Sequence, residues 1–201
     1  EELKLNFEKF IGSYPSTQKV QSLLASRLFN IDKKFILVGN GGAELINELG
    51  KYFNSKFNIF SPTFKEYEQK FKYITVNSIK SENFTFEVNK LLKKNFKTSG
   101  LILVNPDNPS GSFVEKEELV DFISQNKENP IIIDESFMDF AEKKLRYTLI
   151  DESFLAKYKN VFVIKSIGKS FGTGGLRLGI LASGNFQALK KINSQLSIWN
   201  I

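Results

Sequence analysis

Apolar residues follow two alternating patterns along the chain. Short runs that are apolar or β-branched throughout predict buried strands, and stretches with apolar residues at helical spacing separate them. The predicted strands lie at 35–38, 58–64 (a strand followed by a turn), 73–79, 100–105, 130–136, 161–166 and 176–183. The predicted helices lie at 18–29, 43–53, 86–96, 115–127 and 185–201, the last of them interpreted as one amphipathic helix.

This alternation predicts an α/β fold. Strands that are apolar throughout must be covered on both faces, which indicates a three-layer, doubly wound and mainly parallel sheet. Because the chain shows no internal repeat and no linker-like stretch, residues 1–201 are expected to form a single domain. Ligands of such sheets bind beyond the carboxyl ends of the strands, so a functional site is expected in the turns that follow them.

Five of the predicted strands end in a polar or glycine-rich turn. These turns are GNGGAE at 39–44, SPTF at 61–64, NPDNPSG at 105–111, DESF at 134–137 and KSIGKSF at 165–171. The first opens a helix, where free N–H groups attract an anion, although an ordinary tight turn explains its glycines equally well. The third is explained at least as well by a rigid strand-to-helix loop.

Lys169 is the residue that most suggests chemistry. It follows a buried strand in a loop of small residues, and a lysine amine that is partly neutral forms Schiff bases. Arg177 lies eight residues further on among glycines and leucines, and its guanidinium is suited to a phosphate. Asp134 ends the apolar run IIID, where a carboxylate is costly unless it is paired, binds a cation or reaches solvent.

Composition removes several other classes of chemistry. The 201 residues include no cysteine and no histidine, which excludes zinc–thiolate sites, cysteine nucleophiles and Ser–His triads. The net charge of +6 comes almost entirely from lysine, without a basic block, so a lysine-rich surface is a better explanation than nucleic-acid binding. No apolar run approaches the roughly 20 residues of a membrane span, and no signal-peptide pattern is present, so a cytoplasmic protein is expected.

Together these motifs resemble the class I/II aminotransferases, which are fold-type I pyridoxal-phosphate enzymes. The likeness is greatest to histidinol-phosphate aminotransferases, with threonine-phosphate decarboxylases as near kin, and it extends from SYPS at 13–16 to IWNI at 198–201. The resemblance implies pyridoxal 5′-phosphate as the cofactor and a homodimer as the active unit. Family members also carry an N-terminal arm and a small C-terminal domain, which this chain is expected to lack, with 185–201 as the start of an interdomain helix.

The resemblance also implies roles for individual residues. Lys169 would form the Schiff base and then move protons, and Asp134 would pair with the pyridine nitrogen. The other implied cofactor contacts are Asn108 at the phenolic oxygen, Phe64 on the ring face, Gly42, Ala43, Ser166 and Arg177 around the phosphate, and Tyr14 reaching the phosphate in the partner subunit. Phe137 departs from the family, which has a tyrosine there whose hydroxyl bonds the phenolic oxygen.

These assignments predict an aminotransferase that acts on an amino acid or an amino-phosphate, with a 2-oxo acid as the acceptor. Two alternatives stay open. One is a decarboxylase or β-eliminase of the same cofactor class, resembling threonine-phosphate decarboxylase. The other is a catalytically silent binding module on the same fold, which the phenylalanine at position 137 favours.

Overall fold

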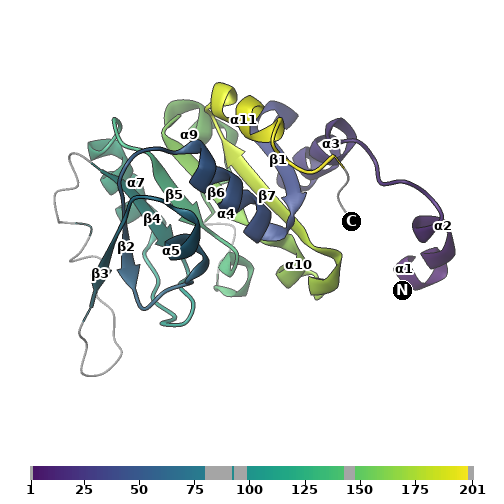
Figure 1. Ribbon diagram of the computed structural model, residues 1–201, viewed down its shortest axis with the longest axis horizontal. Helices are drawn as coiled ribbons and strands as arrows, with labels where there is room; N and C mark the ends of the chain where they lie inside the picture. The colour runs from purple at the N-terminus through teal and green to yellow at the C-terminus, as the bar shows by residue number, and fades with distance from the viewer. Residues whose placement is uncertain (1, 80–91, 93–98, 143–147, 199–201) are drawn as a thin grey trace.

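A seven-stranded sheet runs through the middle of the molecule (Figure 1). The computed structural model describes residues 2–79, 92, 99–142 and 148–198. Within them the strand order is β1-β7-β6-β5-β4-β2-β3. The strands are β1 (Ile36–Asn40), β2 (Phe57–Ser61), β3 (Ile74–Ser78), β4 (Gly100–Val104), β5 (Ile131–Asp134), β6 (Val161–Lys165) and β7 (Leu178–Ser183). Only β7 runs against its neighbours, so the expectation of a mainly parallel sheet is confirmed.

Helices cover both faces of this sheet, which makes the three layers that the sequence predicts. One face carries α4 (Gly41–Tyr52), α5 (Glu66–Lys70) and α11 (Phe186–Asn193). The opposite face carries α3 (Gln18–Phe29), α7 (Lys116–Gln125) and α9 (Glu152–Lys157). Two short helices, α1 (Glu2–Leu5) and α2 (Phe7–Ile11), precede α3, and α10 (Ile167–Ser170) follows β6.

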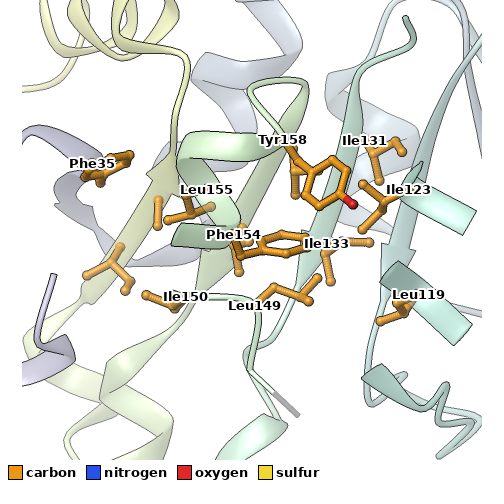
Figure 2. Close-up of a cluster of buried hydrophobic side chains, with 14 of the residues drawn as sticks. Phe35, Leu119, Ile123, Ile131, Ile133, Leu149, Ile150, Phe154, Leu155 and Tyr158 are labelled. Atoms are coloured by element: carbon orange, nitrogen blue, oxygen red, sulfur yellow. The ribbon is translucent and has the colours of Figure 1, made fainter. Parts of the chain in front are cut away.

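Alternation along the central strands divides the apolar side chains between two cores. In β5, Ile133 joins the core under α3, α7 and α9, whereas Ile132 joins the core under α4, α5 and α11. Figure 2 shows the first of these cores, where Phe154 and Tyr158 of the α9 region point toward β5. Each fully buried aliphatic or aromatic side chain contributes roughly 1.5–3 kcal/mol. The same alternation directs Asp134 toward one face and the next residue, Glu135, toward the other.

The end of the chain differs from the single helix predicted at 185–201. The helix α11 ends at Asn193, and the chain then turns, so that the Ser197 hydroxyl donates to Glu44 Oε1 at 2.7 Å. This bond ties the end of the described chain to the first turn of α4. The helix predicted at 86–96 lies outside the described residues except for Leu92. Among the described helices, none is both long and apolar enough to cross a membrane.

Candidate active site

The polar turns predicted from the sequence meet at one edge of the sheet. β1, β2, β4, β5 and β6 all point their carboxyl ends toward that edge, and the antiparallel strand β7 begins there. Contacts between these turns join residues that are up to about 140 positions apart in the sequence: Gly41 with Arg177, Tyr67 with Asp134, and Phe64 with Lys169. The edge therefore forms one candidate site, built from the turns that follow these strands.

Asp134 lies buried at the end of β5, with only 4% of its surface exposed. Its Oδ2 accepts a hydrogen bond of 2.8 Å from the Tyr67 hydroxyl, and its Oδ1 accepts one of 2.9 Å from the backbone N–H of Ser136. Hydrogen bonds to the charged form offset part of the cost of burying a carboxylate. The sequence left open whether Asp134 is paired or merely reaches solvent at the strand end. In the structure it is a buried carboxylate that accepts two hydrogen bonds.

Lys169 stands on α10, directly after β6. Its Nζ lies 3.9 Å from the centroid of the Phe137 ring and 5.8 Å from that of Phe64. Desolvation by this surrounding lowers the pKa of the Lys169 amine, and the negative charge of Asp134 opposes part of that shift. A lowered pKa increases the fraction of neutral amine, which is the form that attacks an aldehyde.

The start of α4 lies beside the Arg177 guanidinium, in the loop before β7. Gly41 adopts φ +76°, a left-handed backbone that favours glycine, and a Cβ there would lie 2.8 Å from Nη2 of Arg177, so the guanidinium lies close against this backbone. At Gly42 a Cβ would lie 3.8 Å from Cβ of Ser166, and Ala43 follows in the same first turn. The N–H groups of a first helical turn have no partner within the helix, so they attract anions. These residues together can hold a phosphate.

The other predicted contact residues lie around this centre. Asn108 and Phe137 line a cavity of about 490 Å³ between the 105–111 loop and the turn after β5. Tyr14 is 84% exposed and lines a second cavity of about 660 Å³ beside α3. Within this chain Tyr14 thus belongs to a surface next to the site, on the N-terminal segment.

Two residues at the site were missed by the sequence reasoning. Gly41 adjoins Arg177, and the Tyr67 hydroxyl, from the first turn of α5, donates to Asp134. Tyr67 lies three residues after Phe64, one helical turn away, so a helix starting after the SPTF turn would have placed both aromatic rings on one face. Burial and the nearby charge of Asp134 raise the pKa of the Tyr67 hydroxyl well above its usual range, so it stays a hydrogen-bond donor.

Replacing Tyr67 with Phe should lower the free energy of unfolding by about 1.5–3 kcal/mol, because Asp134 loses a buried, charge-assisted hydrogen bond. Urea unfolding followed by circular dichroism measures this. Tyr158→Phe is the control, since it removes another buried tyrosine hydroxyl on the opposite face of the sheet. Equal losses in both variants would contradict a special role of the hydrogen bond to Asp134.

Glu135, the neighbour of Asp134, lies fully buried on the opposite face. The Leu149 N–H and the Thr148 hydroxyl each donate to its carboxylate at 2.7 Å. Burial raises its pKa to about 7, and those two hydrogen bonds together with the charge of Lys165 hold the pKa below what burial alone would give. In the folded protein this side chain therefore stays protonated to a higher pH than in the unfolded chain.

This shift predicts a pH-dependent stability. Because the folded pKa of about 7 exceeds the ordinary value of 4.5, the contribution of Glu135 is full below pH 4.5 and is lost as the pH rises to 7. The loss amounts to about 3 kcal/mol over that window. Glu135→Gln should remove this component, so the difference in unfolding free energy between variant and wild type should change between pH 4.5 and 7. A constant difference across that range would refute the assignment.

A buried carboxylate, a lysine of lowered pKa and a first helical turn beside an arginine lie together at the carboxyl edge of a three-layer sheet. Open α/β sheets bind their ligands at that edge, so the fold and the site define an α/β protein with a candidate ligand site. Comparison with known proteins gives this class its family. The sequence profile described as "Aminotransferase class I and II" matches residues 6–200, and the chain belongs to this family. Pyridoxal phosphate is the family's cofactor, as expected from the sequence.

Relatives of two named activities resemble the chain to the same degree. An L-serine phosphate decarboxylase of Campylobacter jejuni is 32% identical, over 93% of this chain and 50% of its own length. A histidinol-phosphate aminotransferase of Brachyspira hyodysenteriae is also 32% identical, over 88% of this chain and 50% of its own length. The chain thus spans about half the length of the curated relatives it matches.

Solved structures show the same fold. A decarboxylase from Sulfurospirillum multivorans superposes with a TM-score of 0.84 at 25% identity, over 98% of this chain and 52% of the other. A histidinol-phosphate aminotransferase from Sinorhizobium meliloti, solved in complex with pyridoxal-5′-phosphate, gives a TM-score of 0.77 at 20% identity, over 94% and 55%. The family fold expected from the sequence is confirmed.

Proposed function

We propose that this chain is the cofactor-binding part of a pyridoxal-phosphate enzyme that transfers the amino group of a small phosphorylated amino substrate. The observation that carries this proposal is the meeting of three groups at one sheet edge: the amine of Lys169, the carboxylate of Asp134 and the start of α4 beside the Arg177 guanidinium. The cofactor has an aldehyde, a pyridine nitrogen and a phosphate, so each group has a chemical counterpart.

Each residue of the candidate site would supply one part of the cofactor chemistry. Pyridoxal phosphate, when bound, supplies an aldehyde for an amine and a ring that withdraws electrons. Lys169 would hold the cofactor through its amine and would carry the proton that leaves and returns to the substrate carbon. Asp134 would hold a proton on the pyridine nitrogen by accepting its hydrogen bond. The first turn of α4, with Ser166 and Arg177, would bind the phosphate, and Phe64 would cover one face of the ring.

Decarboxylation is the second candidate, because the chain resembles a serine-phosphate decarboxylase as closely as it resembles an aminotransferase. The names of the relatives with either activity refer to a phosphorylated substrate. We therefore propose a phosphorylated amino compound as the substrate class for either reaction. The two activities are separated by their products: carbon dioxide from L-serine phosphate, or L-glutamate from histidinol phosphate and 2-oxoglutarate.

The proposal is tested by reducing the protein with borohydride in the presence of pyridoxal phosphate. Mass spectrometry of the digested protein should find the reduced cofactor on Lys169, and the protein should lose its yellow colour. Both product assays are then run on the same preparation. Absence of label on Lys169 would overturn the proposal. Label on Lys169 without either product would instead favour the catalytically silent module.

We also propose a homodimer in which Tyr14 reaches the phosphate site of the partner. The exposure of Tyr14, beside exposed apolar residues of α2 and α3, supports this surface as the place of contact. Analytical ultracentrifugation tests this directly, because a monomer in solution would contradict the proposal. If Tyr14 acts across the interface, mixing a Tyr14→Phe variant with a Lys169→Ala variant should restore activity through the hybrid dimer, whereas sites confined to one chain would stay inactive.

Replacing Phe137 with Tyr should lower the apparent pKa of the absorbance change of the bound cofactor. Phe137 lies against the Lys169 amine, so a hydroxyl there adds a donor to the deprotonated form of the cofactor oxygen next to Asn108. An absorbance titration with pH measures this. Phe140→Tyr is the matched control, because its ring lies 6.2 Å from that of Phe137 and is 65% exposed. An unchanged or higher pKa in Phe137→Tyr would contradict the expected contact.

A further inference from the structure

A carboxylate next to the site joins two turns of the chain. Asp139 lies in the short 3-10 turn Met138–Phe140 that follows β5. Its Oδ1 accepts a bond of 2.6 Å from Lys165 Nζ, and its Oδ2 accepts a hydrogen bond from the Ser170 hydroxyl. Lys165 has only 5% of its side chain exposed. One carboxylate thus connects the turn after β5, the end of β6 and the end of α10.

The members of this cluster are close in sequence to residues of the site, yet the ion pair lies on the other face of the sheet. Lys165 precedes Ser166, and by the alternation along β6 it points toward α3, where its Nζ lies 6.0 Å from the Phe29 ring. Ser170 follows Lys169 directly. The groups that interact with Lys165 are Asp139, the Phe29 ring and the Glu135 carboxyl group.

The short helix that carries Lys169 depends on contacts with other parts of the chain for its stability. The helix α10 has four residues, too few to be stable alone. Asp139 stands two residues after Phe137, whose ring lies against the Lys169 amine. The Asp139 side chain is 22% exposed, but that of Lys165 is buried. Removing Asp139 would leave the buried Lys165 charge uncompensated, so the pair favours this one arrangement of the two turns.

We propose that Asp139 is a positioning residue that holds the amine of Lys169 in place against Phe137, through Ser170 on one side and Lys165 on the other. This role rests on the proposed covalent attachment of the cofactor at Lys169. Asp139 would thus influence the reactivity of the Lys169 amine from the opposite face of the sheet, without touching it.

The test uses Asp139→Asn and Ser170→Ala in the full protein. Ser170→Ala removes only the hydroxyl and leaves the ion pair, so it tests the link even if Asp139→Asn folds poorly. Each variant is expected to attach pyridoxal phosphate to Lys169 about tenfold more slowly or worse, because small misplacement of a reacting group has effects up to roughly 10²-fold. The pH profile of the bound cofactor's absorbance should shift as well.

Two variants in other parts of the chain serve as matched controls for these substitutions. Ser153→Ala removes a hydroxyl that donates to Asp151 at 2.6 Å on α9, and Glu48→Gln breaks an ion pair of 2.6 Å with Lys51 on α4. Neither should alter attachment at Lys169 or its pH profile. If Asp139→Asn and Ser170→Ala attach the cofactor at the wild-type rate with an unchanged pH profile, the positioning role is overturned, whatever their unfolding free energies.

A cofactor-free measurement separates this proposal from the proposed function. Lys169 in the protein without pyridoxal phosphate is labelled with a small acylating reagent, and the rate is followed by mass spectrometry. A positioning role predicts a changed rate at Lys169 in Asp139→Asn and Ser170→Ala, relative to Lys157 in the same samples. A changed rate supports the role even if the wild type does not bind the cofactor, and an unchanged rate contradicts it.

Discussion

Replacing Lys169 with alanine should abolish covalent attachment of the cofactor and lower turnover by roughly 10³–10⁴-fold, the upper range for loss of a proton-transfer group. Under the proposed function, the variant would lack both the amine for the cofactor aldehyde and the base for the substrate proton. The remaining contacts, at Asp134 and at the start of α4, should still bind pyridoxal phosphate without a covalent bond. Borohydride should therefore trap no cofactor on the chain, while dialysis shows that some still binds.

The matched control for this variant is Lys157→Ala, which removes another lysine whose amine lies over an aromatic ring, Tyr158 at 5.0 Å. It should retain both attachment and turnover. Added methylamine should restore part of the activity of Lys169→Ala, because a free amine can replace the missing proton carrier. Turnover within a few-fold of wild type in Lys169→Ala would exclude this residue from the chemistry.

The sheet was predictable because its central strands are buried on both faces. Runs such as IIID and VFVIK have no polar residue until the strand ends, so composition alone separates them from helices. The direction of β7 was not predictable in this way. The reversal depends on the turn at Gly174–Leu176 and on the left-handed backbone of Arg177 (φ 48°), and strand patterns carry no sign of direction.

The site was predictable as far as it depends on turns that follow strands. Asp134 ends such a strand and Lys169 lies in the turn region that follows another, and the chemistry of both shows in the residue type. Tyr67 was missed because its bond to Asp134 spans 67 positions and comes from a five-residue helix with no strong periodicity of its own. Asp139 was missed because an acidic residue in a loop is indistinguishable, in sequence, from a solvated one. Only the packing of β6 beside β5 brings Lys165 to it.

Replacing Asp134 with asparagine should lower turnover by about 10²–10³-fold, the usual effect of removing one electrostatic stabiliser from a site. The change removes the negative charge and keeps the shape. An asparagine oxygen can still accept the Ser136 N–H, and the Tyr67 hydroxyl can accept from the new amide, so the fold should persist. Under the proposed function, the pyridine nitrogen would lose the partner that holds its proton, and the ring would withdraw electrons less strongly.

The measurement should separate attachment from chemistry. Since Lys169 is intact in Asp134→Asn, borohydride should still trap the cofactor there, whereas steady-state turnover falls. A nitrogen-15 spectrum of labelled pyridoxal phosphate should report loss of the proton on the pyridine nitrogen. Asp121→Asn, on the exposed side of α7, removes the same charge far from the site and should change neither reading. A variant that keeps a protonated pyridine nitrogen would show that another group holds that proton, and Asp134 would then be only a partner of Tyr67 in the core.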